Sequence, residues 1–461
     1  MKQENRSNSN LFSAILVLAF AAKIPFLFFG YGVEEDSYGT VVAAHNSYLT
    51  GVLEVSRLPG HPFQEIILSF FYPISSPFFF NLLSCIASLF AVYFFGKVCK
   101  KYSQSFYWLA ALVFSFVPVV FIASVSTIDY MWAMAFAMAS WHGVQKKQMV
   151  WAGVLFGLAI ACRINIAALI LPFVMIEYLE EQKINYKSWL FFLIVCTLTS
   201  FVFFAPVIHR YGWHFFSYSD QFPYPNFPKI VYKSSIGVWG ILGVLAILFY
   251  SFFTFRKNKR ADVVILVFIV LQAIIYLQLP QKSAYLIPTI PFVIWWFLQG
   301  LEAKKFTKLS LILILSAFFC GVNLADTKRG SSSLFKTLEL EIKGQTIFFD
   351  LFSGPVYADY SKRVNKQVYV NQVLAKTNNL NSPTAIISGW WYNQLLVDTY
   401  HKAINPNVHF VFYCNQDSLR RMQQNGWQIF YLAEQEIYNN QMFNMQNTPL
   451  MAKSFDDWQA R

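Results

Sequence analysis

Three adjacent acids are the residues of this 461-residue chain best suited to proton transfer. Glu34, Glu35 and Asp36 stand immediately after the first long apolar run. Neighbouring carboxylates raise one another's pKa, and each ionises more easily when a cation approaches. Such a carboxylate can take the proton of an attacking hydroxyl. The alternative is an acidic patch at the end of an apolar segment that is simply solvated.

Five further polar residues can form a pocket with these acids. Arg57 and His61 lie in a rigid segment with two prolines and a glycine, and Asp129, Arg163 and Lys282 begin or end apolar runs. Cations in such places can hold a phosphate, and an unpaired charge deep in a bilayer costs about 2.5–3.5 kcal/mol. The alternatives are a structural hydrogen bond for His61, an ion pair with Asp129 or snorkelling for Arg163, and an ordinary loop cation for Lys282.

The composition shows which elements must position these residues. The chain is 56% hydrophobic, 19% aromatic and 13% charged, whereas soluble proteins contain about 25% charged residues. The apolar residues form repeated blocks, most of them near bilayer-spanning length. This pattern excludes a soluble enzyme, a disordered chain and a disulfide-stapled secreted module.

Eleven apolar runs are predicted to cross the membrane. The fifth and sixth are short and are expected to form a hairpin that does not cross the whole bilayer. The runs are Leu11–Phe29, Phe78–Gly96, Phe106–Ala123, Tyr130–Val144, Val150–Cys162, Ile164–Ile176, Trp189–Ile208, Ile236–Phe255, Val263–Leu279, Ala284–Leu298 and Leu309–Val322.

The distribution of Lys and Arg predicts the orientation. Most of those in the short connections fall on one side, which is therefore expected to be cytoplasmic. The net charge of +12 is thus mostly explained by topology rather than by nucleic acid binding. The outer side then holds a loop at 30–77 with an interfacial helix over Thr40–Thr50, and an aromatic-rich loop with Tyr218, Phe222, Tyr224 and Phe227.

A polar region follows the last apolar run. We expect residues 1–322 to form the transmembrane part and residues 323–461 a small extracytoplasmic α/β domain with a parallel sheet. Its predicted strands are Thr346–Phe349, Ala385–Ser388, His409–Tyr413 and Gln428–Leu432, and its predicted helices are Trp390–His401, Asp417–Gln424 and Glu434–Met442. It has no glycine-rich phosphate loop and no metal-ligand cluster, so a recognition or packing domain is expected.

Four segments occur in the order typical of one family. They are the acids at 34–36 followed by Arg57-Leu58-Pro59-Gly60-His61-Pro62, then Ser126-Thr127-Ile128-Asp129-Tyr130, then Gly157–Arg163 with an apolar run to Pro172, and Lys282–Pro291. Together they resemble the polytopic C-type (GT-C) glycosyltransferases, particularly the branch of protein O-mannosyltransferases and aminoarabinose transferases. The residue after Pro62 is Phe63 where the O-mannosyltransferase branch commonly has a second proline, and the polar tail matches none known to us.

The resemblance implies an inverting membrane glycosyltransferase at the outer face of a bacterial inner membrane. Its donor would be a polyprenyl-phosphate monosaccharide, and its acceptor a hydroxyl of a glycan, lipid or protein. Because phosphate leaves as a stable anion, one base suffices. The expected roles are Asp36 as base with Glu35 as fallback, Arg163, Lys282 and Tyr285 for the donor phosphate, and Arg57, His61 and Asp129 for the substrate pocket.

Two questions stay open at this point. A flippase or exporter of lipid-linked glycans is the alternative function, although transporters place polar groups near the bilayer midplane, often in repeated halves, and no repeat is evident here. No cofactor is demanded, but Glu34, Glu35, Asp36 and Asp129 could hold a divalent cation. The sugar, the acceptor, the oligomeric state and the role of the C-terminal domain do not follow from the sequence.

Overall fold

A computed structural model describes the chain except residues 1, 214–223, 256, 327–337, 343–344, 401–404, 446–452 and 459–461. The predicted aromatic loop thus falls partly outside the described residues, with Tyr218 and Phe222. Of its other members, Tyr224 donates a hydrogen bond to the carbonyl of Leu277 at 2.9 Å, and Phe227 begins a short helix.

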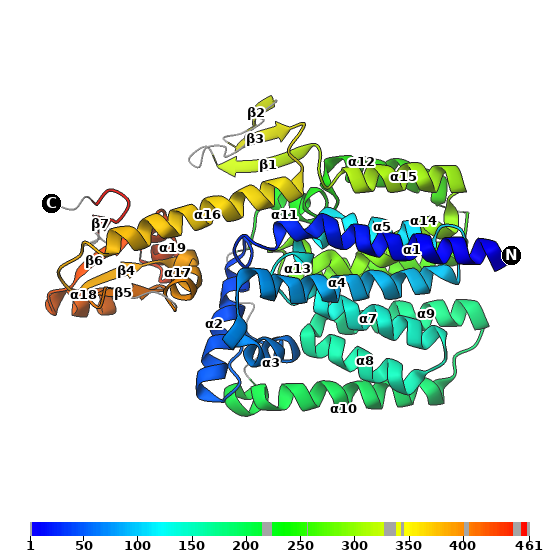
Figure 1. The fold of residues 1–461 in the computed structure, drawn as a ribbon, viewed down its shortest axis with the longest axis horizontal. Helices are drawn as coiled ribbons and strands as arrows, with labels where there is room; N and C mark the ends of the chain where they lie inside the picture. The colour runs from blue at the N-terminus through cyan, green and yellow to red at the C-terminus, as the bar shows by residue number, and fades with distance from the viewer. Residues whose placement is uncertain are drawn as a thin grey trace.

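The first part of the chain is a bundle of apolar helices that run alongside one another (Figure 1). Its helices are α1 (Lys2–Lys23), α4 (Pro77–Lys100), α5 (Tyr107–Phe116), α6 (Pro118–Ser124), α7 (Tyr130–Gln145), α8 (Met149–Cys162), α9 (Ile170–Glu181), α10 (Tyr186–Tyr211), α12 (Ile236–Thr254), α13 (Lys259–Gln278), α14 (Ile290–Gly300) and α15 (Ala303–Leu315). The bundle core is rich in aromatic residues, such as Trp141 stacked on Phe292 with ring centroids 4.7 Å apart.

Four helices of the described residues, α4, α10, α12 and α13, are long and apolar enough to cross a membrane. A fifth is counted if α5 and α6, bent by 71° at Val117, form one span. The bend follows from Pro118, which disfavours helical backbone at the residue before it. The chain is thus a multi-pass membrane protein, and the predicted count of eleven spans is not confirmed.

Several predicted spans form helices too short to be counted as crossing a membrane, and this explains much of the difference between the predicted and the counted spans. The predicted fifth and sixth runs appear as α8 and α9, 14 and 12 residues long, joined by the 3₁₀ segment η3 (Ile164–Leu169) with Arg163 at the tip. The late run begins with a 3₁₀ segment, η6 (Ser283–Thr289), and continues as the 11-residue α14. An apolar run in the sequence therefore does not always become one straight helix.

Short helices cover one end of the bundle. The residues Thr40–Thr50, for which a helix was predicted, form part of α2 (Glu35–Thr50), which runs across the ends of the long helices (Figure 1). Gly51 ends α2 with a φ of +69°, a conformation that glycine adopts without strain. The other covering elements are α3 (Pro62–Phe70), α11 (Phe227–Ser234), and the 3₁₀ segments η1 (Ile24–Phe26) and η2 (Tyr72–Ile74).

The small parallel sheet predicted for the C-terminal region is confirmed. Strands β4 (Thr384–Ile387), β5 (Val408–Val411), β6 (Gln428–Tyr431) and β7 (Lys453–Ser454) pair in the order β5-β4-β6-β7. Its helices are α17 (Tyr392–Thr399), α18 (Gln416–Gln424) and α19 (Gln435–Met442), with η7 (Gly389–Trp391) before α17. This α/β unit lies beyond the end of the bundle that carries α2 (Figure 1).

One strand of the prediction is placed wrongly, and one helix is missed. The segment Thr346–Phe349 belongs to β3 (Gln345–Asp350), which pairs antiparallel with β1 (Gly321–Asp326) and β2 (Leu338–Ile342) in a separate sheet. The missed helix is α16 (Pro355–Thr377), which connects that sheet to the α/β unit (Figure 1). The buried residues of α16 include the charged Arg363, so the helix has no regular apolar face that the sequence could show.

Candidate active site

The three adjacent acids lie where helix α2 begins. Glu34 is the N-cap residue, and Glu35 and Asp36 occupy the first turn. Negative charge is favoured at a helix N-terminus because the backbone N–H groups there point outward. The side chain of Asp36 is 21% exposed, so a ligand can approach it.

A buried asparagine connects this segment to the one that carries Asp129. The Asn81 side chain of α4 donates hydrogen bonds to the carbonyls of Leu27 and Gly30, at 3.0 and 2.8 Å, and accepts one from Thr127 at 2.8 Å. The Thr127 N–H also donates to the carbonyl of Tyr31 at 2.7 Å. These bonds fix the start of the segment 30–77 against the residues just before Asp129.

The turn that carries Arg57 and His61 is organised by Glu65. The fully buried Glu65 carboxylate accepts hydrogen bonds from the Ser56 N–H and hydroxyl, both at 2.7 Å, and from the His61 N–H at 2.9 Å. Gly60 has a φ of +91°, and a Cβ there would lie 2.7 Å from the Val55 side chain. The compact turn therefore requires glycine at this position.

Five charged residues form a chain of alternating sign at this end of the bundle. Lys282 contacts Asp36, and Arg57 bridges Asp36 at 2.5 Å and Asp129 at 3.1 Å. Arg163 pairs with Asp129 at 2.5 Å. The order of these ion-paired residues is thus Lys282, Asp36, Arg57, Asp129, Arg163. Lys282 and Asp36 are 246 positions apart in the sequence.

The two candidate bases have opposite electrostatic environments. Burial alone would raise the pKa of Asp36, but the charges of Arg57 and Lys282 hold it well below the usual range of an aspartate. Burial together with the neighbouring Asp36 charge raises the pKa of Glu35 to about 8. The Asn393 amide donates a hydrogen bond to Glu35 at 2.6 Å. At neutral pH Asp36 is therefore ionised and Glu35 is mostly protonated.

Arg163 and His61 are held in place by structural contacts. The Arg163 guanidinium lies over the rings of Tyr130 and Tyr285, at 4.2 and 5.0 Å from their centroids, besides pairing with Asp129. The His61 Nδ1 lies 2.8 Å from the carbonyl of Cys162. Burial lowers the pKa of His61 to about 4, so it is neutral at neutral pH. The sequence allowed an ion pair with Asp129 as the alternative role of Arg163, and a structural hydrogen bond as the alternative role of His61. The structure contains both contacts.

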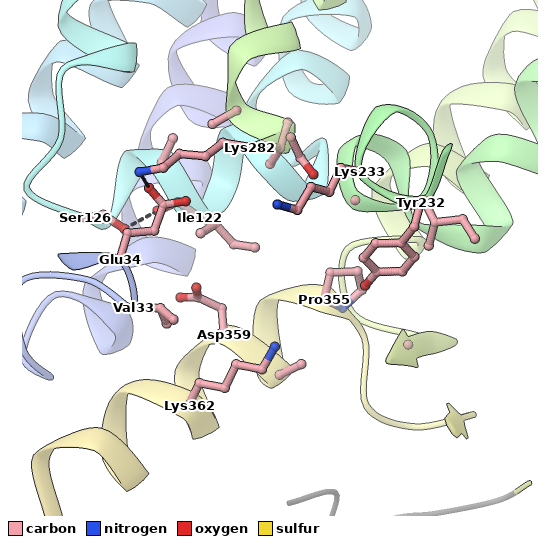
Figure 2. A pocket seen from close by; sticks show the side chains of 18 of the residues that line it. Val33, Glu34, Ile122, Ser126, Tyr232, Lys233, Lys282, Pro355, Asp359 and Lys362 are labelled. Atoms are coloured by element: carbon pink, nitrogen blue, oxygen red, sulfur yellow. Dashed lines mark hydrogen bonds and ion pairs between the residues drawn. The ribbon is translucent and has the colours of Figure 1, made fainter. Parts of the chain in front are cut away.

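A cavity of about 340 Å³ lies beside this chain of charges. Figure 2 shows Glu34 and Lys282 on one side of it, Lys233 of α11 on another, and Asp359 and Lys362 extending from α16. Glu34 accepts a hydrogen bond from Lys282 at 2.6 Å. Asp36 does not line the cavity itself and is connected to it through Lys282.

Apolar side chains form much of the remaining wall of the cavity. They come from α6 and α12 and from the segment before α7, and are Val119, Ile122, Ala123, Ile128, Ile236 and Ile241. A pocket of this size with an apolar wall and a few charged groups is typical of a small-molecule site. The combination suits a ligand with an apolar chain and an anionic head group.

The structure brings most of the predicted site residues together. Asp36, Lys282, Arg57, Asp129 and Arg163 are in one network, His61 lies 3.4 Å from Asp129, and Tyr285 contacts Arg163. Glu35 faces the C-terminal region instead. Among the described residues, no three His, Cys, Asp or Glu side chains are placed to hold a metal ion.

Several positioning residues were not found from the sequence. Asn81 and Glu65 are buried in the structure. In the sequence both are polar residues beside apolar ones, and this pattern could have indicated their importance. Lys366 of α16 donates to the carbonyl of Val33 at 2.7 Å, and Asn393 of α17 binds Glu35. Nothing in the sequence indicates that α16 and α17 pack on the membrane part.

The structure therefore defines a polytopic membrane protein with a charged cavity at one end of its helix bundle. No known family model matches the chain, and no curated protein matches it. It is similar to two crystal structures of ArnT from Cupriavidus metallidurans, one in the apo state and one bound to undecaprenyl phosphate.

The extent of this likeness is limited. The apo structure is 15% identical with a TM-score of 0.48, over 65% of this chain and 61% of that one. The lipid-bound structure is 14% identical with a TM-score of 0.46, over 67% of this chain and 63% of that one. This chain thus spans less than two thirds of the length of each.

Proposed function

We propose that this protein is a membrane glycosyltransferase that moves a monosaccharide from a polyprenyl phosphate to an acceptor hydroxyl on the outer face of the membrane. One observation carries the proposal. Lys282 lines a cavity with an apolar wall and at the same time contacts Asp36, so one cation faces both a phosphate site and a base. The order of the four sequence segments that resemble the C-type glycosyltransferases supports the same class.

The reaction follows from this pair. The acceptor hydroxyl attacks the anomeric carbon and gives its proton to Asp36, and the bond from that carbon to the phosphate oxygen breaks. The phosphate leaves with the bonding electrons, and Lys282 stabilises its charge. Because attack and departure are on opposite faces, the anomeric centre is inverted.

Lys282 also couples donor binding to the strength of the base. Without donor, Lys282 and Arg57 keep the pKa of Asp36 low, which makes it a weak base. A donor phosphate in the cavity competes for Lys282 with Asp36 and Glu34. As Lys282 moves toward the phosphate, the pKa of Asp36 rises and the carboxylate becomes a better proton acceptor. Arg163, held by Asp129, and the Tyr285 hydroxyl remain predicted phosphate contacts, and Arg57, His61 and Asp129 predicted pocket residues.

The activity is tested directly with the purified protein. Full-length protein in lipid nanodiscs is incubated with polyprenyl-phosphate sugars labelled in the sugar and with an extract of envelope glycans, lipids and proteins. We expect free polyprenyl phosphate to appear together with labelled acceptor. Movement of intact donor across a vesicle membrane, without release of polyprenyl phosphate, would instead indicate the flippase and contradict the proposal.

The pH dependence separates the two candidate bases. In the donor-free protein Asp36 is ionised across the neutral range because its pKa is lowered, so with Asp36 as base kcat/KM, which reports the free enzyme, should show no carboxylate-dependent rise between pH 6 and 8. Glu35 is protonated below its pKa of about 8. With Glu35 as base, the rate would climb about tenfold per pH unit toward that value. The Glu35→Gln variant, which can still accept the Asn393 hydrogen bond, should keep the wild-type profile.

A further inference from the structure

The C-terminal region is anchored on the two segments that carry the candidate acids. Arg363 of α16, 3% exposed, donates to the carbonyl of Val125 at 2.7 Å and to the Ser126 hydroxyl at 2.6 Å. Lys366, one turn further along, donates to the carbonyl of Val33. One face of α16 thus contacts both the residues before Glu34 and the residues before Asp129.

The same helix supplies part of the cavity wall. Asp359 and Lys362 are three residues apart and so lie on neighbouring positions of the α16 surface, and both line the cavity (Figure 2). Asp359 is held by Arg363 at 2.7 Å. Lys362 is exposed, and within the described part of the chain it makes no ion pair or hydrogen bond. Its ammonium group is therefore available to a ligand.

A second lysine approaches the cavity from α11. Lys233 donates a hydrogen bond to the carbonyl of Gln281, and it is close enough to Lys282 and Glu34 to respond to their charges. It has no carboxylate ion pair among the residues that the structure describes. Burial lowers the pKa of Lys233 to about 8, and a bound anion would offset this effect.

The charge balance of the cavity indicates the kind of ligand. Of the three lysines that line it, Lys282 is already paired with Glu34 and Asp36, and Asp359 is paired with Arg363. Among the described residues, Lys233 and Lys362 make no ion pair with a carboxylate, although the charge of Lys362 acts on Asp359 and that of Glu34 acts on Lys233. Two such ammonium groups facing one cavity favour an anion that accepts several hydrogen bonds, and a phosphate has this chemistry.

We propose that Lys233 and Lys362 bind the phosphate of the lipid-linked donor together with Lys282, so that the C-terminal region completes the donor site. This inference rests on the proposed function and extends it. Neither lysine belongs to the four segments that resemble the glycosyltransferase family. The apolar wall from α6 and α12 then accommodates the first isoprene units of the lipid.

Binding of labelled polyprenyl phosphate to the full-length protein in nanodiscs tests this inference without requiring turnover. Lys233→Ala and Lys362→Ala should each weaken binding about 10- to 150-fold, since a hydrogen bond to a charged group is worth about 1.5–3 kcal/mol and each 1.4 kcal/mol is tenfold. Lys362→Arg should retain most of the affinity. Lys187→Ala, at an exposed lysine of α10 that does not line the cavity, is the control and should bind like the wild type.

Competitors distinguish the sources of the phosphate. Inorganic phosphate should displace the label only at far higher concentration, and polyprenol without a phosphate should not displace it. Equal competition by inorganic phosphate would overturn the lipid part of the inference. If Lys233→Ala and Lys362→Ala bind like the wild type while Lys282→Ala does not, the inference fails and the proposed function stands. If the wild type binds no polyprenyl phosphate, both fail.

Discussion

Replacing Asp36 with asparagine should reduce the rate of sugar transfer about 100- to 10,000-fold, the range that a general base typically contributes. The amide keeps the size of the side chain and can still accept a hydrogen bond from Arg57 or Lys282, but it cannot take the acceptor's proton. The measurement is release of polyprenyl phosphate in a single turnover, with donor bound before acceptor is added. Donor binding should change far less than the rate, because Lys282 remains.

A matched control comes from the same segment, residues 30–77. Glu54 pairs with Arg210 at 3.3 Å and lies outside the charge network of Asp36. Glu54→Gln should therefore transfer sugar at the wild-type rate. Full transfer by Asp36→Asn would show that Asp36 is not the base, and a large loss in Glu35→Gln instead would assign that role to Glu35.

Removing Asp129 should give the largest loss of stability of any single substitution in the site. Its side chain is 1% exposed and pairs with Arg57 and Arg163. Burial alone would raise its pKa, but the neighbouring His61, Arg163 and Arg57 lower it to about 2. Asp129→Ala would leave two guanidinium groups buried and short of a partner. Breaking a buried pair in this way costs about 3–5 kcal/mol. Thermal unfolding in detergent, followed by tryptophan fluorescence, measures the effect.

A double variant separates charge from packing in this prediction. Adding Arg163→Met to Asp129→Ala removes one of the two unpaired charges while keeping much of the side-chain volume. The double variant should therefore unfold at a higher temperature than Asp129→Ala alone. An Asp129→Ala protein as stable as the wild type would contradict the structural role assigned to this network.

The sequence could predict which residues meet, but not how they pair. The apolar runs and loop charges predict Asp36, Asp129 and Lys282 on the same side of the membrane, and the structure places these residues in one network. That Arg57 would bridge the two aspartates depends on the turn organised by Glu65. Such a turn is set by side-chain hydrogen bonds, which residue spacing does not encode.

In the C-terminal region, the sequence predicted only those elements whose buried side chains are apolar. The strands β4, β5 and β6 are short apolar runs and were found, because their side chains form a buried core. Helix α16 turns polar groups, among them Arg363 and Lys366, toward the membrane part. A buried face made of cations resembles a solvent-exposed face in the sequence, and its role in the site was therefore missed.

The most direct test of the central claim is a structure of the protein bound to polyprenyl phosphate in a nanodisc, determined by electron cryomicroscopy. The account predicts phosphate density in the cavity beside Lys282, with its ammonium within hydrogen-bonding distance of a phosphate oxygen and Asp36 on the adjoining side. Phosphate bound elsewhere, with Lys282 still paired to both Glu34 and Asp36, would contradict it.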